Sequence, residues 1–401
     1  MISIQEALDL VKTVLPQPQT EDISLEDAIE RVLAQPVFAT EPMPQFTNSA
    51  MDGFAVRWDD VQFATEAQPV KLQITSESRA GVPAAAHLQS GEAMRISTGA
   101  MVGNGADTVV PIENTEIHEQ TVIVKKVNNR HQHLRFAGEE YTAGTELLPV
   151  GTVLNPAQIA VAASQGAAMV AVYRRPRVAI IGTGTELVDV AQTPAAGQIR
   201  DSNGIMLAAA AQKFGGKVVS RQRVGDDFSA TVAAIEHASA VADVILFSGG
   251  VSVGPHDLVK KAAQECGFET IFWRVRQKPG KPLYFARAAK TLLFGLPGNP
   301  VSAYMCFLYY VQPVLRFANG TGFSHRRFTG VLAAQLENRL DRDQLFRVNC
   351  QYPTDSLPIV SPQEKQASHM LTSVSNASGF IVLPSGQILQ KGVQTEVLKM
   401  I

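Results

Sequence analysis

Three turns rich in glycine and hydroxyl residues carry the groups with which proteins bind phosphate and other oxyanions. They are GTGTE (182–186), SGGVSVG (248–254) and GLPGNPVS (295–302), and each follows a short apolar stretch. Glycine allows positive φ angles and a close approach of the backbone, and we expect each turn to precede a helix whose free N–H groups attract anions. One such turn is weak evidence, because most matches are only tight turns. Three turns at one sheet edge predict a site for an extended anion such as a nucleotide.

The turns define the residues that we expect to bind this anion: Gly182, Thr183, Gly184, Ser248, Gly249, Gly250, Ser252, Gly298, Asn299 and Pro300. Two lysines, Lys278 and Lys281, flank a rigid Pro-Gly turn in RQKPGKPLYF, so two ammonium groups would stand near the same rim. They would neutralise phosphate charge; the alternative is that both are solvated surface lysines.

Three acidic residues, Glu186, Asp226 and Asp257, follow predicted strands. Carboxylates beside phosphate-binding turns suit a bridging divalent metal, because Mg²⁺ takes one or two carboxylates plus substrate oxygens. The alternative for each acid is a helix N-cap, and Asp226 in VGDDFSA is the clearest such case. The sequence therefore predicts a metal site at this rim and leaves the N-cap alternative open.

Two further stretches, NSAMDGFAVR (48–57) and MRISTGAMVGNGADTVVPIE (94–113), interleave turn residues with possible ligands. The simplest interpretation of Asp52-Gly53 and of Thr98-Gly99 is a tight turn without a ligand role. The histidines form no metal-binding pair, and the three cysteines are far apart and lack metal spacing. Buried thiols in a reduced, cytoplasmic interior are the simplest interpretation.

Composition describes an ordinary globular protein of several domains. The 401 residues exceed what one core organises, 45% are apolar, 18% are charged, and the net charge is -2. This balance gives no general bias toward nucleic acid or anionic membranes. We see no apolar run long enough to span a bilayer and no signal peptide, which again favours the cytoplasm.

Periodicity and punctuation divide the chain into four expected domains. Capping boxes at Ser3 and Ser24 predict two amphipathic helices, whose apolar stripes pack on this chain's core or form a dimer contact. Residues 1–45 and 141–173 form one domain, which includes a helix capped by Asn155. Residues 46–140 are rich in strands and turns, 174–318 have the rhythm of a parallel α/β sheet, and 319–401 form a small β-domain.

Taken together, the ordered motifs NSAMDGFAVR, RISTGA, GADTVV, AGEEYTAG, GTGTELV, SGGVSVGPHD, KPGKP and GLPGNPVSA resemble the molybdopterin molybdenumtransferase family, known as MoeA, which includes the E-domain of gephyrin. The resemblance runs from the N-terminal helices to the terminal β-domain. Each is weak alone, but their order is highly specific.

The resemblance implies an elongated homodimer with four domains per subunit: an extended dimerising domain, a β-rich domain, a molybdopterin-binding-like parallel α/β domain and a small C-terminal β-barrel. It also implies a reaction that requires a divalent metal such as Mg²⁺, joins molybdate to the dithiolene of adenylylated molybdopterin, and releases AMP and molybdenum cofactor. Transient contacts with the molybdopterin adenylyltransferase and with molybdoenzyme maturation proteins follow from the same resemblance.

The family's functional residues map onto named positions of this sequence. Glu186, Asp226 and Asp257 would bind metal or the pterin nucleotide, while Asp52 and Thr98 would reach the site from the facing subunit. Oxyanions would be held by Lys278, Lys281, Ser302 and, on a looser alignment, Arg347.

Three positions depart from the family pattern. Glu140 replaces an aspartate and so reaches one methylene further, and Arg274 replaces a lysine. Thr372 stands where the family has a serine, although neighbouring Ser373 leaves that assignment open. No departure removes a charge, so we expect activity to survive.

Two other classes of function compete with this interpretation. A non-catalytic scaffold of the gephyrin type would not require the full set of acids and lysines. An adenylyltransferase or nucleotide hydrolase would need the α/β domain but not the module that contains NSAMDGFAVR.

Overall fold

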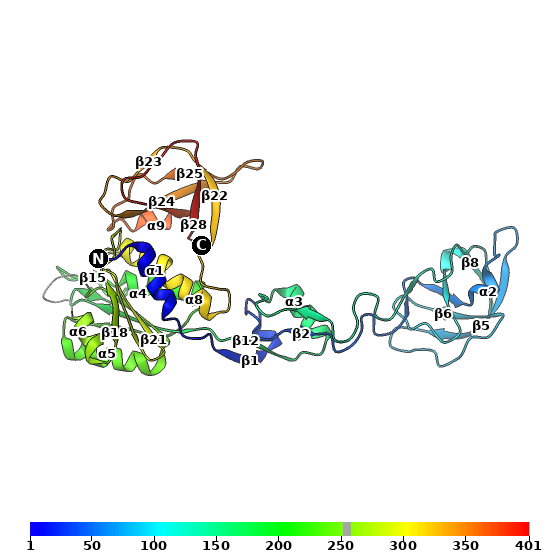
Figure 1. Cartoon of the computed structure of the whole chain (residues 1–401). Coiled ribbons are helices and arrows are strands. Elements are labelled where there is room, and N and C mark those ends of the chain that lie inside the picture. Colours follow the sequence, from blue (N-terminus) through cyan, green and yellow to red (C-terminus); the bar gives the residue numbers. More distant parts are fainter. Residues whose placement is uncertain (252–257, 401) are drawn as a thin grey trace. The chain divides into compact units, whose positions relative to one another are not determined.

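The computed structural model describes residues 1–251 and 258–400, which form two compact units (Figure 1). The large unit comprises Met1–Ile23, Arg31–Ala34 and the chain from Ala171 onward, and the inserted unit comprises Ser24–Glu30 and Gln35–Val170. This division is coarser than the four expected domains, whose boundaries stay a prediction.

A six-stranded sheet forms the centre of the large unit. Its strand order is β16 (Lys217–Val224), β13 (Arg177–Thr183), β17 (Val244–Ser248), β21 (Thr291–Leu296), β20 (Tyr284–Ala288) and β18 (Glu269–Trp273). The first four strands are parallel, as the sequence predicts, and β20 is antiparallel to both of its neighbours. The strands β13 and β17 are continuous apolar runs because both faces of the sheet are covered.

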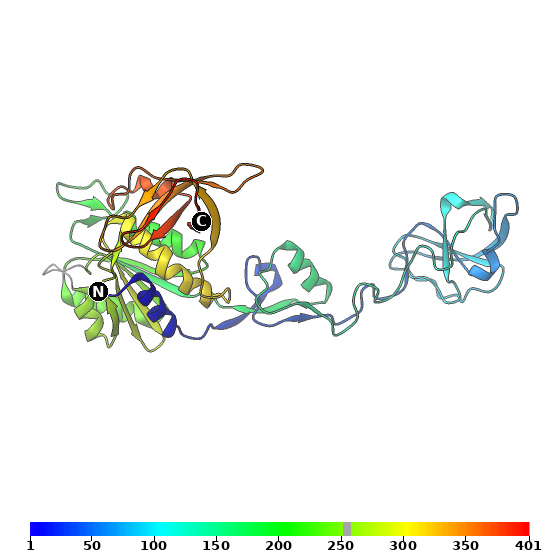
Figure 2. The same cartoon turned by 45° about the horizontal axis from the view of Figure 1, so that its top comes forward.

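Helices cover both faces of this sheet (Figures 1 and 2). One face packs against α1 (Ile4–Thr13), α4 (Ser202–Lys213), α7 (Pro300–Cys306), the π-helical segment η3 (Phe307–Val311) and α8 (Gln312–Ala318). The other face packs against α5 (Phe228–Val241) and α6 (Val259–Glu265). The buried residues Ile180 and Leu246 belong to the first core, and Ile181 and Phe247 to the second, because successive side chains of a strand point to opposite faces.

The N-terminal capping signals have different outcomes. At α1 the predicted box is confirmed, with Ser3 Oγ accepting from the Glu6 N–H and the Glu6 carboxylate accepting from the Ser3 N–H. The second predicted helix is wrong: after β1 (Thr20–Ser24) only one 3-10 turn, η1 (Leu25–Asp27), forms. The chain leaves the helical conformation by Glu30, whose φ is 59°, and this turn leaves the apolar side chain of Ile29 exposed.

A closed β-barrel follows the α/β sheet. Its strands are β22 (Arg327–Leu332), β24 (Asp343–Gln351), β25 (Ile359–Pro362), β26 (Gly379–Leu383) and β28 (Gln394–Lys399), and the additional pairing of β24 with β26 closes the ring. β19 (Gln277–Lys278) joins β24 from outside, and a hairpin pairs β23 (Leu336–Glu337) with β27 (Ile388–Leu389). The short helix α9 (Thr372–Ser375) precedes β26. The predicted combination of an α/β sheet and a small terminal β-barrel is confirmed.

The inserted unit is rich in strands, as predicted. Its six-stranded sheet has the order β7 (Thr108–Pro111), β4 (Gly53–Val56), β6 (Glu92–Ile96), β5 (Val70–Ser78), β9 (Thr121–Val124) and β8 (Thr115–His118). Smaller pairings join β2 (Val37–Phe38) to β11 (Glu146–Leu148) and β3 (Asn48–Ser49) to β10 (Leu134–Arg135). The expected helix α3 (Pro156–Ser164) is capped by Asn155. Among the described residues, no helix is long and apolar enough to cross a membrane.

Candidate functional site

The predicted anion-binding turns begin at one edge of the α/β sheet. Gly182 of β13 pairs with Ser248 of β17, which pairs with Leu296 of β21, so these three parallel strands end side by side. Strand β18 runs in the same direction as β21, because β20 is antiparallel to both. Its last residue, Trp273, donates from Nε1 to the Val251 carbonyl at 3.1 Å. Loops from four strands therefore start at the edge where ligands of such sheets bind.

The turn after β17 packs directly on Thr183. Gly249 and Gly250 have φ angles of 95° and 67°, which are unfavourable for residues with a side chain. A Cβ at Gly249 would lie 2.8 Å from Thr183 Oγ1 and 2.9 Å from the Thr183 carbonyl oxygen. Only glycine therefore allows this turn to approach β13 so closely.

Asn203, at the start of α4, bridges two of the predicted turns. Its Nδ2 donates to Ser248 Oγ at 2.8 Å and to the Gly298 carbonyl at 2.7 Å. A carbonyl can only accept, so the amide NH₂ must face it, and Oδ1 is then buried without a hydrogen-bond partner among the described residues. Sequence reasoning missed Asn203. The detectable signal was Asp201, an N-cap that precedes it and accepts from the Gly204 N–H at 2.8 Å.

The turn GTGTE differs from its prediction in one respect, because no helix follows it. The chain continues into β14 (Leu187–Val188), which pairs with β15 (Ile199–Arg200), and the Gly184 N–H donates to the Val224 carbonyl. Helices do follow the other two turns, α6 after β17 and α7 after β21. A helix is therefore the next described element after two of the three turns.

Two of the three predicted acids lie around this turn. Asp226 Oδ2 accepts from the Thr185 hydroxyl at 3.1 Å and from the Thr185 N–H at 3.4 Å. The alternative role for Asp226 as an N-cap is wrong, because Asp227 caps α5 by accepting from the Ala230 N–H. The exposed carboxylate of Glu186 folds over Gly184.

The third acid, Asp257, lies outside the described residues, as does Ser252. Residues 1–251 and 258–400 contain no group of three His, Cys, Asp or Glu side chains arranged to hold a metal ion. The predicted three-carboxylate site therefore remains a prediction.

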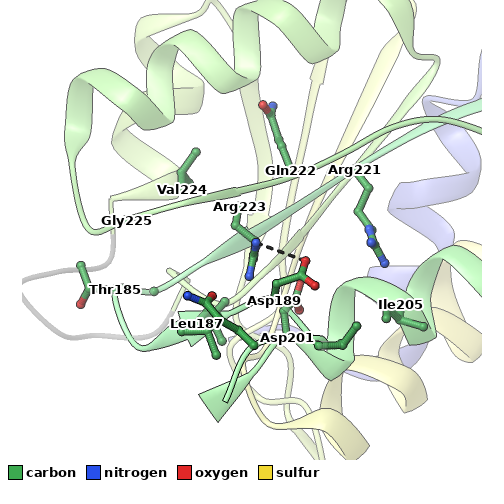
Figure 3. A pocket seen from close by; sticks show the side chains of 14 residues that line it. Thr185, Leu187, Asp189, Asp201, Ile205, Arg221, Gln222, Arg223, Val224 and Gly225 are labelled. Carbon is green, nitrogen blue, oxygen red and sulfur yellow. Dashed lines mark hydrogen bonds and ion pairs between the residues drawn. The ribbon is translucent and has the colours of Figure 1, made fainter. Parts of the chain in front are cut away.

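Two cavities open beside these turns. The smaller, of about 80 Å³, is lined by Thr183, Glu186, Asn203, Ser248, Gly298 and Pro300, among others. The larger, of about 570 Å³, extends from Gly184 and Thr185 to Arg221 and Arg223 of β16 (Figure 3). Arg223 pairs with Asp189 at 3.4 Å, as Figure 3 shows. Leu187 and Asp201 line both cavities, so the two spaces adjoin.

The two predicted lysines lie in the loop that leaves β18, and both are exposed. Within this loop the Val275 N–H donates to the Lys281 carbonyl at 3.0 Å, and Lys278 pairs with Gln344 of the barrel strand β24. The loop is thus fastened at one end to the Val251 carbonyl through Trp273 and along its side to the barrel.

Arg347 lies further along β24 and is fully buried. Its Nη2 donates to the Lys365 carbonyl at 3.2 Å, but Nε and Nη1 have no hydrogen-bond partner among the described residues. Burial disfavours the charged form and lowers the pKa of the guanidinium to about 10. Residues 365–368, which include the Lys365 carbonyl that Arg347 binds, also contact the third turn, since Asn299 Nδ2 donates to Ser368 Oγ at 3.3 Å.

The remaining predicted residues of the large unit divide by exposure. Ser302 is buried on α7, whereas Thr372 is exposed at the start of α9. Ser373 is buried and donates from Oγ to the Met370 carbonyl at 2.6 Å, so of the two neighbours Thr372 has the accessible hydroxyl. The choice between them stays a prediction.

In the inserted unit, the structure joins two of the three predicted residues. Asp52 Oδ1 accepts from the Thr98 N–H at 2.7 Å. Glu140 lies on another part of the chain, where its N–H donates to the Met43 carbonyl, and no described hydrogen bond links it to Asp52 or Thr98.

Comparison with known proteins covers nearly the whole chain. Three family models match: the MoeA N-terminal region (domain I and II) at residues 2–166, the probable molybdopterin binding domain at 179–316, and the MoeA C-terminal region (domain IV) at 329–400.

Relatives with similar sequences include the Mycobacterium tuberculosis protein named molybdopterin molybdenumtransferase 2, which is 35% identical over 99% of both chains. The Nostoc protein named molybdopterin molybdenumtransferase is 39% identical over 80% of this chain and 75% of its own. The crystal structure of the molybdopterin biosynthesis MoeA protein from Pyrococcus horikosii superposes with a TM-score of 0.87 at 29% identity, covering 100% of this chain and 99% of that one.

Proposed function

The chain belongs to the MoeA family, and from this premise we propose that it is a molybdopterin molybdenumtransferase, which inserts molybdenum from molybdate into adenylylated molybdopterin and releases AMP. One observation carries the proposal beyond the family name. The turns at Thr183, Gly249 and Gly298 meet at one sheet edge, where Asn203 joins the second turn to the third and the lysine loop is attached.

This arrangement suits two anions that repel each other. Molybdate is a tetrahedral dianion and the pterin nucleotide carries a pyrophosphate, so holding both needs cations and N–H donors fixed before binding. The turns would bind the pyrophosphate, and Lys278, Lys281, Ser302 and Arg347 would bind molybdate. Nε and Nη1 of Arg347 have no hydrogen-bond partner within residues 1–251 and 258–400, which supports its role, because a buried cation without a counter-charge is costly unless a ligand supplies one.

The larger cavity suits the bulky part of the substrate. Its volume of about 570 Å³ lies within the usual range for small-molecule sites. Arg221 adds positive charge to its wall, whereas the charge of Arg223 is balanced by Asp189. We assign this cavity to a pterin or nucleotide moiety.

The ligand types at this rim suit a magnesium ion. Glu186 and Asp226 offer hard carboxylate oxygens on either side of Thr185, and Mg²⁺ completes such a set with substrate oxygens. Glu186, Asp226 and Asp257 would hold the ion. When bound, it would offset the charge of the phosphate oxygens.

Distribution of charge supports a homodimer that shares its sites. The inserted unit contains 17 Asp and Glu and only 8 Lys and Arg. The whole chain contains 37 acidic and 35 basic residues, so the rest of the chain has 20 acidic and 27 basic ones. Opposite net charges favour docking of one copy's inserted unit beside the large unit of another. Asp52, Thr98 and Glu140 would enter the facing subunit's site in this way.

The cysteines form no disulfide, which supports a cytoplasmic setting.

The reaction is tested by incubating the protein with adenylylated molybdopterin, Mg²⁺ and molybdate while AMP is measured. We expect AMP release that requires molybdate and yields a cofactor able to activate an apo-molybdoenzyme. AMP release at the same rate without molybdate would instead indicate a nucleotide hydrolase. Absence of release would contradict the proposal and favour a non-catalytic scaffold.

A further inference from the structure

The loop that carries Lys278 and Lys281 rests on a buried polar cluster that no sequence motif marks. Gln277 is 1% exposed although both lysines beside it are exposed. Gln277 and Lys278 are consecutive residues of β19, so their side chains point to opposite faces of the strand. Because the Gln277 side chain is fixed inside the protein, the side chain of Lys278 must point outward from the opposite face of β19.

The Gln277 amide is held on both sides. Its Nε2 donates to the Gly280 carbonyl at 3.1 Å and lies 3.3 Å from Cys306 Sγ, while its Oε1 accepts from the Tyr310 hydroxyl at 2.5 Å. The Gly280 carbonyl can only accept, so the NH₂ group must face it and Oε1 must face Tyr310. Gln277 thus spans the Lys-Pro-Gly-Lys turn from within and permits one orientation only.

Gly280 closes against the same cluster. Its φ is 96°, and an added Cβ would overlap Cys306 Sγ and come within 2.7 Å of Gln277 Nε2. Burial raises the pKa of the Cys306 thiol to about 12 and that of the Tyr310 hydroxyl well above its ordinary value. Both groups therefore keep their protons at neutral pH, and Tyr310 stays a hydrogen-bond donor to Gln277.

One continuous helical segment supplies both partners of Gln277. It starts at Pro300, directly after the turn Gly298-Asn299, passes Cys306 at the end of α7, and continues as η3, where Tyr310 lies. The π-helical turn changes the phase of the helix, a feature often found near functional sites. The lysine loop and the third anion-binding turn are therefore positioned by the same helix.

We propose that Gln277, Cys306 and Tyr310 are positioning residues, which hold the lysine loop so that Lys278 and Lys281 present their ammonium groups to molybdate. This inference rests on the proposed function for its substrate. Its mechanical part, that the buried cluster holds the loop, does not.

The test compares the wild type with Y310F and with the double variant Q277M/Y310F. Y310F leaves Gln277 Oε1 buried and unpaired, whereas the double variant replaces both partners of that hydrogen bond by apolar groups of similar shape and loses only the donor to the Gly280 carbonyl. Y284F is the matched control, because Tyr284 is also fully buried but its hydroxyl bonds to Thr270 of β18 and not to the Gln277 cluster. Each protein is assayed for molybdate KM and kcat, thermal stability, and hydrogen exchange at Arg274 and Val275, whose N–H groups bond across the loop.

For Y310F we expect a molybdate KM about tenfold higher with little change in kcat, and exchange at Arg274 and Val275 about tenfold faster. The double variant should regain part of the thermal stability but keep the high KM and the fast exchange, since Q277M also removes the bridge from Gln277 to the Gly280 carbonyl. A merely structural cluster would regain wild-type KM together with stability, and that result would overturn the proposal.

The two proposals fail in distinguishable ways. If the wild type shows no molybdenum transfer, the proposed function is wrong, and exchange in the loop still decides whether the cluster holds it. If the wild type is active but Y310F exchanges and binds molybdate like Y284F, the positioning role is wrong and the proposed function stands.

Discussion

The carboxylate of Asp52 accepts a 2.7 Å hydrogen bond from the backbone N–H of Thr98, although 46 positions separate the two residues. Both side chains are exposed, so this contact leaves the second carboxylate oxygen and the threonine hydroxyl accessible. The hydrogen bond joins the two turns that carry them, for each of which the sequence alone favours an ordinary tight turn.

If Asp52 serves the facing subunit, Asp52→Ala should lower molybdenum transfer by about two orders of magnitude. Mixing it with Glu186→Ala should restore activity, because a mixed dimer contains one site in which both residues are intact. Random pairing of equal amounts predicts about a quarter of wild-type activity. Either variant mixed with itself is the control, and a mixture no more active than its components would contradict sharing between subunits.

Asp226→Asn should raise the Mg²⁺ concentration needed for half-maximal activity by about tenfold or more, because it removes a charged ligand but keeps an acceptor for Thr185. Asp227→Asn is a close control, since asparagine also caps helices and α5 should remain intact. Magnesium titration of both variants provides the measurement. Equal shifts in the two would show that Asp226 has no special relation to the metal.

Gly249→Ala should destabilise the protein by more than Gly267→Ala. Both glycines have positive φ angles, 95° and 79°, and alanine costs about 1 kcal/mol in that conformation. Only Gly249 would also collide with Thr183, whereas a Cβ at Gly267 meets no atom within 4 Å. Urea unfolding should show the extra loss, together with weaker nucleotide binding; identical free energies of unfolding would refute the packing argument.

Arg347→Met should make the protein more stable and less active. The variant removes a buried guanidinium whose Nε and Nη1 have no partner in the described part of the chain, and replacing such a charge by an apolar side chain can add about 1–4 kcal/mol. At the same time the molybdate KM should rise at least about tenfold. Denaturant unfolding and steady-state kinetics test the two effects, and a loss of stability would mean that the charge is compensated.

Stability should fall as the pH drops below about 6.5, and His325 should account for part of this fall. Its ring is buried, stacks on Tyr309 and donates from Nε2 to the Tyr309 carbonyl at 2.8 Å. Burial lowers the pKa of His325, so the unfolded chain binds a proton at a higher pH than the folded chain does. The contribution of His325 to stability is therefore fully present above the pKa of histidine in the unfolded chain. It is lost as the pH falls toward the lower pKa of His325 in the folded protein.

The loss should approach about 1.4 kcal/mol for each pH unit within that window. His325→Gln keeps an N–H donor but does not titrate, so its unfolding free energy should depend less on pH between 7 and 5. The same slope in both proteins would exclude His325 as the source.

Local signals predicted much of the fold. The capping box of Ser3 and Glu6 and the Asn155 cap each act over a few residues, and both helices form where expected. The signal at Ser24 produced only one turn, because a cap initiates a helix but packing must sustain it. Likewise, two adjacent aspartates could each cap α5, and only the path of the chain showed that Asp227 does so.

The sequence by itself determined where backbone must bend or lie buried: apolar runs such as β13 and β17 have few alternatives, and glycine is required wherever φ is positive near a neighbour, as at Gly249. Tertiary structure alone decided which distant polar groups meet. Asn203 bonds to Ser248 and Gly298, and Gln277 bonds to Tyr310, across 33 to 95 positions of chain. No local pattern marks such partners, because a buried amide is satisfied by whichever donor or acceptor the packed helices and strands bring within reach.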